Sequence, residues 1–246
     1  MSLLLIDMGN SYLKWTLASD AGDVSKVNSI PLGSVSEYSW DSCERPARIL
    51  VSCVSSPNHK QALIASIKNK WQRVPQFLSS PAQGVGVSNA YSKPSRLGSD
   101  RWAAMVAAYH IAQMAVLVVD AGTALTVDAI DAKGTHLGGL ISPGLQLSRS
   151  ILDTGTQINI DYAQMDTSNR FFGTSTEAGI IAGTTYAADG LIERAFNELS
   201  AITDSGETRC ILTGGDAVQL EKTLQCPCAL EPALVLKGLA LIATAS

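Results

Sequence analysis

The most constraining feature of this sequence is an internal repeat, in which two similar segments stand 113 residues apart. Each segment has an apolar run, an Asp-x-Gly turn and a second run of strand-like composition, over residues 3–17 and 116–130. Asp7 aligns with Asp120 and Gly9 with Gly122, without a gap. Each segment therefore predicts a β-hairpin. A repeat of this length is typical of a duplicated domain, because solenoid repeats have periods of roughly 20–50 residues.

Strand-like and helix-like segments alternate in both halves of the chain. Beyond the hairpins, the patterns predict strands over residues 48–54 and 210–213, and helices over 60–71, from 99 onward, and over 176–199. Residues 83–93 and 138–144 are rich in glycine and predict loops or turns. The alternation predicts an α/β architecture, divided near Met114 into domains of residues 1–114 and 115–246.

The helix predicted from residue 99 has an apolar face at helical spacing. Trp102, Met105, Val106 and Tyr109 recur at i, i+3, i+4 and i+7. We expect Ser99 to cap this helix and a carboxylate to be favoured in its first turn, where the next residue is acidic.

Composition narrows the class of protein. With 46% hydrophobic and 16% charged residues, the chain predicts a compact core. With a net charge of -4, the chain lacks the basic character typical of a nucleic-acid binder. Backbone amides can still hold an anionic substrate. Five thinly spread cysteines predict reduced thiols, and no apolar run reaches the roughly 18 residues of a membrane span. We therefore expect a soluble, cytoplasmic protein that binds neither nucleic acid nor membrane.

Three turns are candidates for chemistry, at residues 7–14, 120–123 and 213–216. Each follows an apolar strand and combines glycine with small polar residues. Glycine lets backbone N–H groups converge on a phosphate that a β-carbon would exclude, and the carboxylates at the strand ends could meet a metal ion. The structural alternative for any one of them is an ordinary hairpin with an Asx turn. The matched pair followed by Thr-Gly-Gly-Asp favours phosphate binding.

At these residues the sequence resembles the type III pantothenate kinases, within the actin, sugar-kinase and Hsp70-like ATPase superfamily. Residues 7–14 resemble the first phosphate motif, Asp-x-Gly-Asn-Thr-x-x-Lys, with Ser11 in place of threonine. Residues 98–101 resemble the Gly-x-Asp-Arg motif, and residues 120–124 the second phosphate motif. Residues 134–144 resemble the stretch Gly-x-His-Leu-Gly-Gly-x-Ile-x-Pro-Gly.

The resemblance implies a fold and an activity. The fold would be two duplicated ribonuclease H-like domains with an interdomain cleft. The activity would be ATP-dependent phosphorylation of pantothenate to phosphopantothenate, the first step of coenzyme A biosynthesis. The resemblance also implies a homodimer.

For the nucleotide, the resemblance implies contacts from both hairpins. Asp7 would help to hold Mg²⁺, through water, because that ion dehydrates reluctantly. Asp120 would ligate a monovalent cation, K⁺ or NH₄⁺. The residues implied to bind ATP are Asp7, Met8, Gly9, Asn10, Ser11, Tyr12, Leu13, Lys14 and Thr123. For Lys14, which lies on a predicted strand, a solvated face position is the alternative to a phosphate contact.

For pantothenate, the resemblance implies Asp100 as the catalytic base that accepts the hydroxyl proton. Arg101 would clamp the pantothenate carboxylate with its planar fork. The residues implied to bind pantothenate are Tyr91, Gly98, Ser99, Asp100, Arg101 and Thr176. Ser175 stands where the family commonly has asparagine, which weakens the assignment of Thr176. The alternatives are an ion pair of Arg101 on its own helix and an ordinary loop aromatic at Tyr91.

Two other functions fit parts of the sequence. One is a non-catalytic regulatory or accessory protein that keeps the kinase fold, and the intact Asp100 argues against it. The other is a related superfamily member that acts on a sugar, acetate or polyphosphate, and the shortness of the chain argues against that. None of the three histidines has metal-ligand spacing, and no catalytic role is expected for them.

Overall fold

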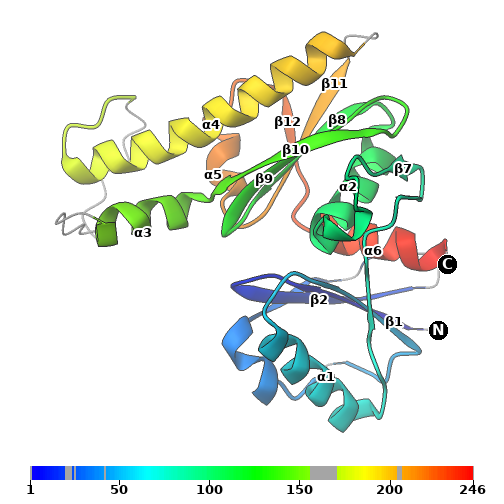
Figure 1. The fold of residues 1–246 in the computed structure, drawn as a ribbon. Helices are drawn as coiled ribbons and strands as arrows, with labels where there is room; N and C mark the ends of the chain where they lie inside the picture. Colours follow the sequence, from blue (N-terminus) through cyan, green and yellow to red (C-terminus); the bar gives the residue numbers. More distant parts are fainter. Residues whose placement is uncertain are drawn as a thin grey trace. The chain divides into compact units, whose positions relative to one another are not determined.

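The computed structural model describes residues 2–19, 24, 26–41, 43–155, 171–203 and 207–245, which form two five-stranded sheets, one two-stranded sheet and the helices around them (Figure 1). The first large sheet has the order β3-β2-β1-β4-β5. Its strands are β1 (Leu3–Met8), β2 (Tyr12–Ala18), β3 (Asn28–Pro31), β4 (Arg48–Cys53) and β5 (Gln76–Phe77). Strands β1, β2 and β3 are successively antiparallel, whereas β1, β4 and β5 run parallel.

The second large sheet repeats this arrangement, with the order β10-β9-β8-β11-β12. Its strands are β8 (Ala115–Ala121), β9 (Ala124–Ile130), β10 (His136–Pro143), β11 (Thr208–Thr213) and β12 (Cys228–Leu230). Strands β8, β11 and β12 run parallel, as β1, β4 and β5 do. The matching strand orders confirm the duplicated α/β fold that the repeat predicted.

The chain divides into two compact units. One contains residues 1–114, 130–138 and 233–246, and the other contains residues 115–129 and 139–232. The segments 130–138 and 233–246 are thus grouped with the N-terminal residues, whereas the predicted domains were continuous along the chain. Packing explains the position of the last segment, because a β-carbon on Gly238 would collide with the backbone of Ala103.

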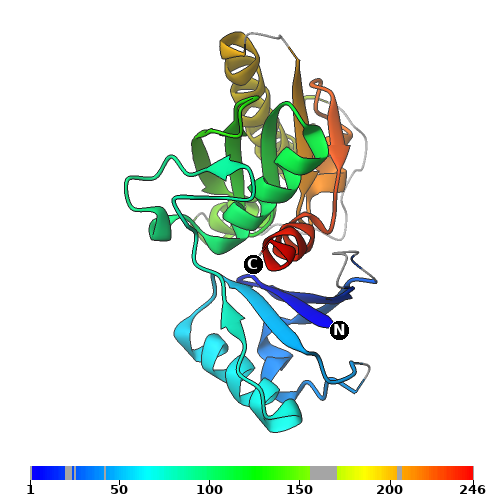
Figure 2. The same cartoon turned by 90° about the vertical axis from the view of Figure 1, so that its right-hand side faces the viewer.

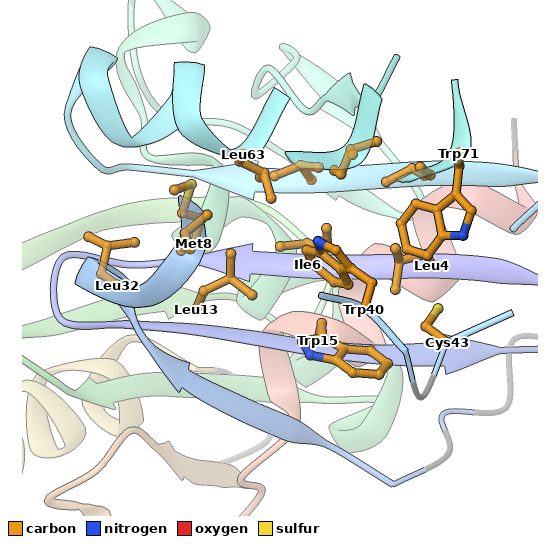
Figure 3. Close-up of a cluster of buried hydrophobic side chains, with 14 residues drawn as sticks. Leu4, Ile6, Met8, Leu13, Trp15, Leu32, Trp40, Cys43, Leu63 and Trp71 are labelled. Carbon is orange, nitrogen blue, oxygen red and sulfur yellow. The ribbon is translucent and has the colours of Figure 1, made fainter. Parts of the chain in front are cut away.

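In the first unit, helix α1 (Pro57–Trp71) covers one face of the β1–β5 sheet. Leu63 and Trp71 of this helix belong to the same buried cluster as Ile6 and Trp15 of the strands (Figure 3). Trp40 is fully buried at the centre, and its indole N–H donates to the Ser66 hydroxyl at 2.8 Å. A buried aromatic cluster of this kind fixes the sheet against its helix.

Helices α2 (Ser99–Ala112) and α6 (Leu234–Thr244) pack together in the same unit (Figure 2). Small side chains at Ala103, Ala104, Ala107 and Ala108 make this close packing possible, and all four are buried. The short 3-10 helices η1 (Leu32–Glu37) and η2 (Pro94–Arg96) complete the unit's helical structure among the residues described.

In the second unit, α4 (Thr176–Ile202) lies alongside α3 (Leu145–Gly155), and α5 (Ala217–Glu221) follows β11 (Figure 1). The apolar core joins α4 to the sheet through Ile192 and Leu199, both buried. Within the described residues, no helix combines the length and apolarity needed to span a membrane.

Three local predictions were wrong or incomplete. Ser99 is the first helical residue of α2, and Gly98 is the cap. The Ser99 hydroxyl does not cap the helix because it accepts from the Cys53 N–H on strand β4. Residues 138–144, predicted as a turn region, lie mostly in strand β10, because the edge of a sheet tolerates glycine. Residues 83–93, predicted as a loop, include the short strands β6 (Gln83–Gly84) and β7 (Val87–Ser88).

Candidate active site

The first predicted phosphate hairpin is formed by β1 and β2. The two strands are joined by a three-residue turn, Gly9–Ser11, in which the Gly9 N–H donates to the Tyr12 carbonyl at 3.1 Å. The side chains of Met8 and Leu13 are fully buried in the core (Figure 3). Those two residues therefore present only their backbone groups at the turn.

Glycine at position 9 is not required by the protein's own packing. A β-carbon there would meet only the Tyr12 carbonyl oxygen, at 3.4 Å, and the backbone is not in the left-handed region. Gly122 in the second hairpin is similar, with its nearest atoms at 3.5 and 3.6 Å. Open space beside both glycines suits a ligand that approaches the backbone closely.

Three polar residues form a row across the first sheet. Lys14 on β2 lies opposite Asp7 on β1, and Ser52 on β4 lies beside Asp7 on the other side. Residues paired in register point to the same face, and neighbouring strands are about 4.8 Å apart. Ile6 and Met8, which belong to the core under α1, must point to the opposite face.

This row is joined to the start of helix α2 by hydrogen bonds. The hydroxyls of Ser52 and Ser99 are 3.1 Å apart, and the Ser99 hydroxyl accepts from the Cys53 N–H at 3.1 Å. Asp100 follows immediately in the first turn. The sequence predicted Asp7 and Asp100 as separate motifs, and the Ser52–Ser99 contact joins the two motifs at one end of the sheet.

Arg101 and Tyr91 are in direct contact. Arg101 is 8% exposed as a whole residue, and its guanidinium donates from Nη1 to the Tyr91 hydroxyl oxygen at 3.0 Å. The Tyr91 N–H donates to the Asn89 side chain at 2.9 Å, within the loop that precedes the helix. The predicted pantothenate residues 91 and 98–101 are therefore neighbours in the first unit.

The second hairpin packs against two further turns of the second unit. Its turn has two residues, Gly122–Thr123, so it is one residue shorter than the first although the sequences align without a gap. The Gly144 N–H donates to the Thr123 carbonyl at 3.0 Å, and the Asp216 N–H donates to the Ala121 carbonyl at 3.0 Å. The predicted turns at 120–123 and 213–216 are thus adjacent.

Gly214 makes this adjacency possible. Its φ of +96° lies in the left-handed region, and a β-carbon would be 2.5 Å from both the Ala121 backbone and Asp120 Oδ1. Only glycine fits between the two turns. Asp120 therefore lies beneath the Gly-Gly turn, half-buried.

Arg149 of α3 was missed by the sequence analysis. The side chain is only 4% exposed, and its guanidinium donates to the hydroxyls of Thr184 at 3.2 Å and Thr185 at 3.3 Å. Burial raises the pKa of the Asp216 carboxylate, and the positive charge of Arg149 opposes this rise. Nothing in the local pattern around position 149 marks a buried cation, because its partners come from α4 and the turn before α5.

Thr176 begins helix α4 and is exposed. The preceding Ser175 is the cap, and its hydroxyl accepts from the Ala178 N–H at 3.1 Å. Serine thus performs the capping role that the family's usual asparagine could also perform.

The described residues include no group of three or more His, Cys, Asp or Glu side chains that could hold a metal ion by themselves. Mg²⁺ is commonly bound by one or two carboxylates together with waters and substrate phosphates. Asp7 at a strand end, next to an open glycine turn, fits that mode of binding.

Comparisons with known proteins identify the family of this chain. The family model described as type III pantothenate kinase matches residues 3–198. A type III pantothenate kinase from Nitrosococcus oceani is 35% identical over 98% of this chain and 93% of its own length. One from Nitrosospira multiformis is 37% identical over 98% of this chain and 90% of its own.

Solved structures support the fold. A protein from Campylobacter jejuni, described as a conserved member of the Baf family of transcriptional activators, aligns with a TM-score of 0.61 and 22% identity, covering 97% of this chain and 96% of that one. An archaeal actin homologue, Ta0583, aligns with a TM-score of 0.51 and 10% identity over the full length of both chains. At these identities the likeness concerns the fold alone, which is the actin-like ATPase fold that the family resemblance implied. The family match and the relatives together show that this chain belongs to the type III pantothenate kinase family.

Proposed function

We propose that this chain transfers a phosphoryl group from ATP to pantothenate, giving phosphopantothenate, the first step of coenzyme A biosynthesis. Family membership supports the reaction. One observation supports assigning this reaction to particular residues. In the first unit, Asp100 follows Ser99, whose hydroxyl contacts Ser52, and Arg101 donates to Tyr91. This group contains an acid, a cation and a hydroxyl at the end of the sheet that also carries the Asp7 hairpin.

Asp100 would accept the proton of the pantothenate hydroxyl. A carboxylate is a weak base at neutral pH, and phosphoryl transfer has a loose transition state. The larger part of its contribution would therefore be to orient the hydroxyl in line with the phosphate. The Ser99 anchor supports that task, because it holds the first turn of α2 against β4.

Arg101 would bind the pantothenate carboxylate. Its Nη1 donates to the Tyr91 hydroxyl at 3.0 Å, and this contact fixes the orientation of the guanidinium. A planar fork matches a carboxylate in a bidentate pair. Gly98, Ser99 and Tyr91 would complete this part of the site. The family resemblance also assigns Thr176 of α4 to pantothenate.

Each hairpin would bind phosphate groups of ATP. Gly9, Asn10, Ser11 and Thr123 offer backbone amides, an amide side chain and hydroxyls, and Met8 and Leu13 are limited to their backbone. Lys14 lies in register with Asp7, so its positive charge is available on the same face of the sheet. Tyr12, 56% exposed, lies beside the turn.

Two cations would assist the phosphoryl transfer. ATP would bring Mg²⁺ to Asp7, with water completing its shell, and a monovalent cation, K⁺ or NH₄⁺, would bind at Asp120. When bound, these ions would neutralise phosphate charge. The residues fit, because Asp120 is held under the Gly214 turn and Asp7 lies near the end of strand β1, beside the open glycine turn.

The active form would be a homodimer. Strand β10 lies at the edge of the second sheet and exposes Leu140 (45%) and Ile141 (65%). The adjacent helix α3 exposes Leu147 (39%) and Ile151 (51%). An edge strand with exposed apolar side chains is a template for association, so these four residues would be covered by a second copy.

The experiment is a phosphotransfer assay of the purified chain with ATP, Mg²⁺, K⁺ and pantothenate, with phosphopantothenate measured by mass spectrometry. Glucose, acetate and polyphosphate serve as alternative substrates. Asp100→Asn should lower turnover by about 100-fold or more while thermal unfolding stays nearly unchanged. A folded protein that yields no phosphopantothenate at saturating ATP would exclude the proposal. If the protein were instead a non-catalytic regulator, the Asp100→Asn variant would keep the phenotype of the wild-type chain.

A further inference from the structure

His136, at the start of strand β10, lies against the group that would bind pantothenate. The residue is 1% exposed and belongs to the same compact unit as Tyr91 and Arg101. Its ring is stacked on the Tyr91 ring, with centroids 6.1 Å apart and planes 16° apart. The sequence analysis gave this histidine no role, because it lacks metal-ligand spacing.

Tyr91 is fixed from three sides. The His136 ring lies on one face, the Asn89 side chain accepts from the Tyr91 backbone N–H at 2.9 Å, and Arg101 Nη1 donates to the hydroxyl oxygen at 3.0 Å. Because Arg101 uses the Tyr91 hydroxyl as a partner, the position of the tyrosine ring influences the direction of the guanidinium.

The histidine is itself held by the backbone of the Tyr91 loop. The N–H of Ala90 donates to His136 Nδ1 at 3.4 Å. Nearby, the Ser88 N–H donates to the Gly134 carbonyl at 2.9 Å, and residues 88 and 135 form a parallel bridge. Since Nδ1 faces an N–H donor, the ring takes the tautomer that carries its proton on Nε2.

Glycine at position 134 permits this docking. Its φ is +82°, and a β-carbon would collide with the Gly86 carbonyl oxygen. The segment 134–136 is therefore seated directly on the loop that leads to Tyr91. His136 is the member of that segment whose side chain reaches the tyrosine.

We propose that His136 is a positioning residue for pantothenate binding, acting through Tyr91 on Arg101. It holds the tyrosine ring so that the hydroxyl meets Arg101 Nη1, and this contact fixes the orientation of the guanidinium that would bind the substrate carboxylate. This inference rests on the proposed function, since it assigns Tyr91 and Arg101 to pantothenate. It predicts an effect on the KM for pantothenate and little effect on ATP or on the chemical step.

The test compares steady-state kinetics of the wild-type chain with His136→Ala, His136→Phe and His136→Asn. Loss of an aromatic pair corresponds to about a three- to tenfold change. His136→Ala should raise the KM for pantothenate by that factor and leave kcat and the KM for ATP within about twofold. His136→Phe should recover most of the affinity, because it keeps the stacked ring, and His136→Asn should recover less.

A double-mutant cycle tests the route of the effect. If His136 acts through Tyr91, the KM of the His136→Ala/Tyr91→Ala variant should equal that of Tyr91→Ala alone. Additive effects would overturn the inference, as would equal changes in both KM values. If His136→Ala does not fold, the same cycle with His136→Asn decides the question.

The matched control is His110→Ala. His110 lies on α2 in the same unit and also touches an aromatic ring, Tyr109, at 6.3 Å, but its Nδ1 is paired with the Val106 carbonyl. This variant should leave the KM for pantothenate unchanged. A wild-type chain without pantothenate kinase activity would overturn the proposed function and this inference with it. An active wild-type chain whose His136 variants behave like the control would overturn only the inference.

Discussion

Gly98 and Asp100 are fitted to one another at the start of helix α2. A β-carbon on Gly98 would occupy the position of Asp100 Oδ1, which accepts a hydrogen bond from the Arg101 N–H at 2.8 Å. The glycine in Gly-x-Asp-Arg is thus explained by the carboxylate two residues later. Its φ of -54° is open to any residue.

Gly98→Ala should therefore impair catalysis much more than stability. The added methyl group displaces the end of a flexible side chain, so the unfolding temperature should change little, whereas kcat should fall by about tenfold or more because a small misplacement of a catalytic group is costly. Steady-state kinetics and thermal unfolding check both parts. Gly33→Ala is the matched control, since a β-carbon there meets no described atom within 4 Å. Unchanged kcat in Gly98→Ala would contradict the role given to Asp100.

Asp120 should make the activity dependent on a monovalent cation. Replacing K⁺ by Na⁺ should lower the rate of the wild-type chain, and Asp120→Asn should lower the rate in K⁺ by at least about tenfold. In the variant the rates in K⁺ and in Na⁺ should also be nearly equal, because the carboxylate that would bind the cation is gone. Initial rates at constant ionic strength measure this. Equal wild-type rates in K⁺ and Na⁺ would remove the cation assignment.

The exposed apolar residues of β10 and α3 should hold a dimer together. Ile141→Asp places a charge at the most exposed of these positions, and burying an unpaired charge is strongly unfavourable. Light scattering coupled to size-exclusion chromatography should show a shift from dimer to monomer. Val218→Asp, at an apolar position of α5 that is 53% exposed, is the control and should remain dimeric. A wild-type monomer would contradict the homodimer.

Asp189 of α4 should make the second unit less stable as the pH rises. Burial raises the pKa of this carboxyl to about 6, and the negative charge of Glu193 adds to the rise. The side chain is 4% exposed and neither oxygen has a hydrogen-bond partner among the described residues, since the Thr223 hydroxyl donates to the Leu220 carbonyl at 3.2 Å. Below the unfolded pKa of about 3.8 the group is protonated in both states, so no charge is buried and the pH-dependent cost vanishes.

The cost of Asp189 should grow between about pH 4 and pH 6 and then stay constant, reaching about 3 kcal/mol. Asp189→Asn should therefore stabilise the protein at pH 7.5 and have little effect near pH 4. Urea unfolding at several pH values measures the difference. Glu198→Gln, an exposed carboxylate on the same helix, should show no such trend. A stabilisation by Asp189→Asn that does not vary with pH would refute the assigned cause.

The sequence alone determined the duplication, the α/β class and the family. The aligned Asp-x-Gly hairpins require no long-range information, because an apolar run, a glycine turn and a second run describe a local structure. The same holds for helix α1, whose composition predicted residues 60–71 of the observed Pro57–Trp71. The motifs at 7–14, 98–101 and 120–124 are contiguous in the chain, so they could be recognised without coordinates.

Only the tertiary structure decided which side chains meet. Ser52 and Ser99, Tyr91 and His136, and Arg149 and Thr184 are 47, 45 and 35 residues apart in sequence, and no local pattern links them. Even the cap of α2 was mispredicted, because the Ser99 hydroxyl accepts a hydrogen bond from the Cys53 N–H on β4. Periodicity reports the burial of a face, whereas hydrogen bonds and ring contacts depend on which elements the fold brings together, and that is settled by packing over the whole chain.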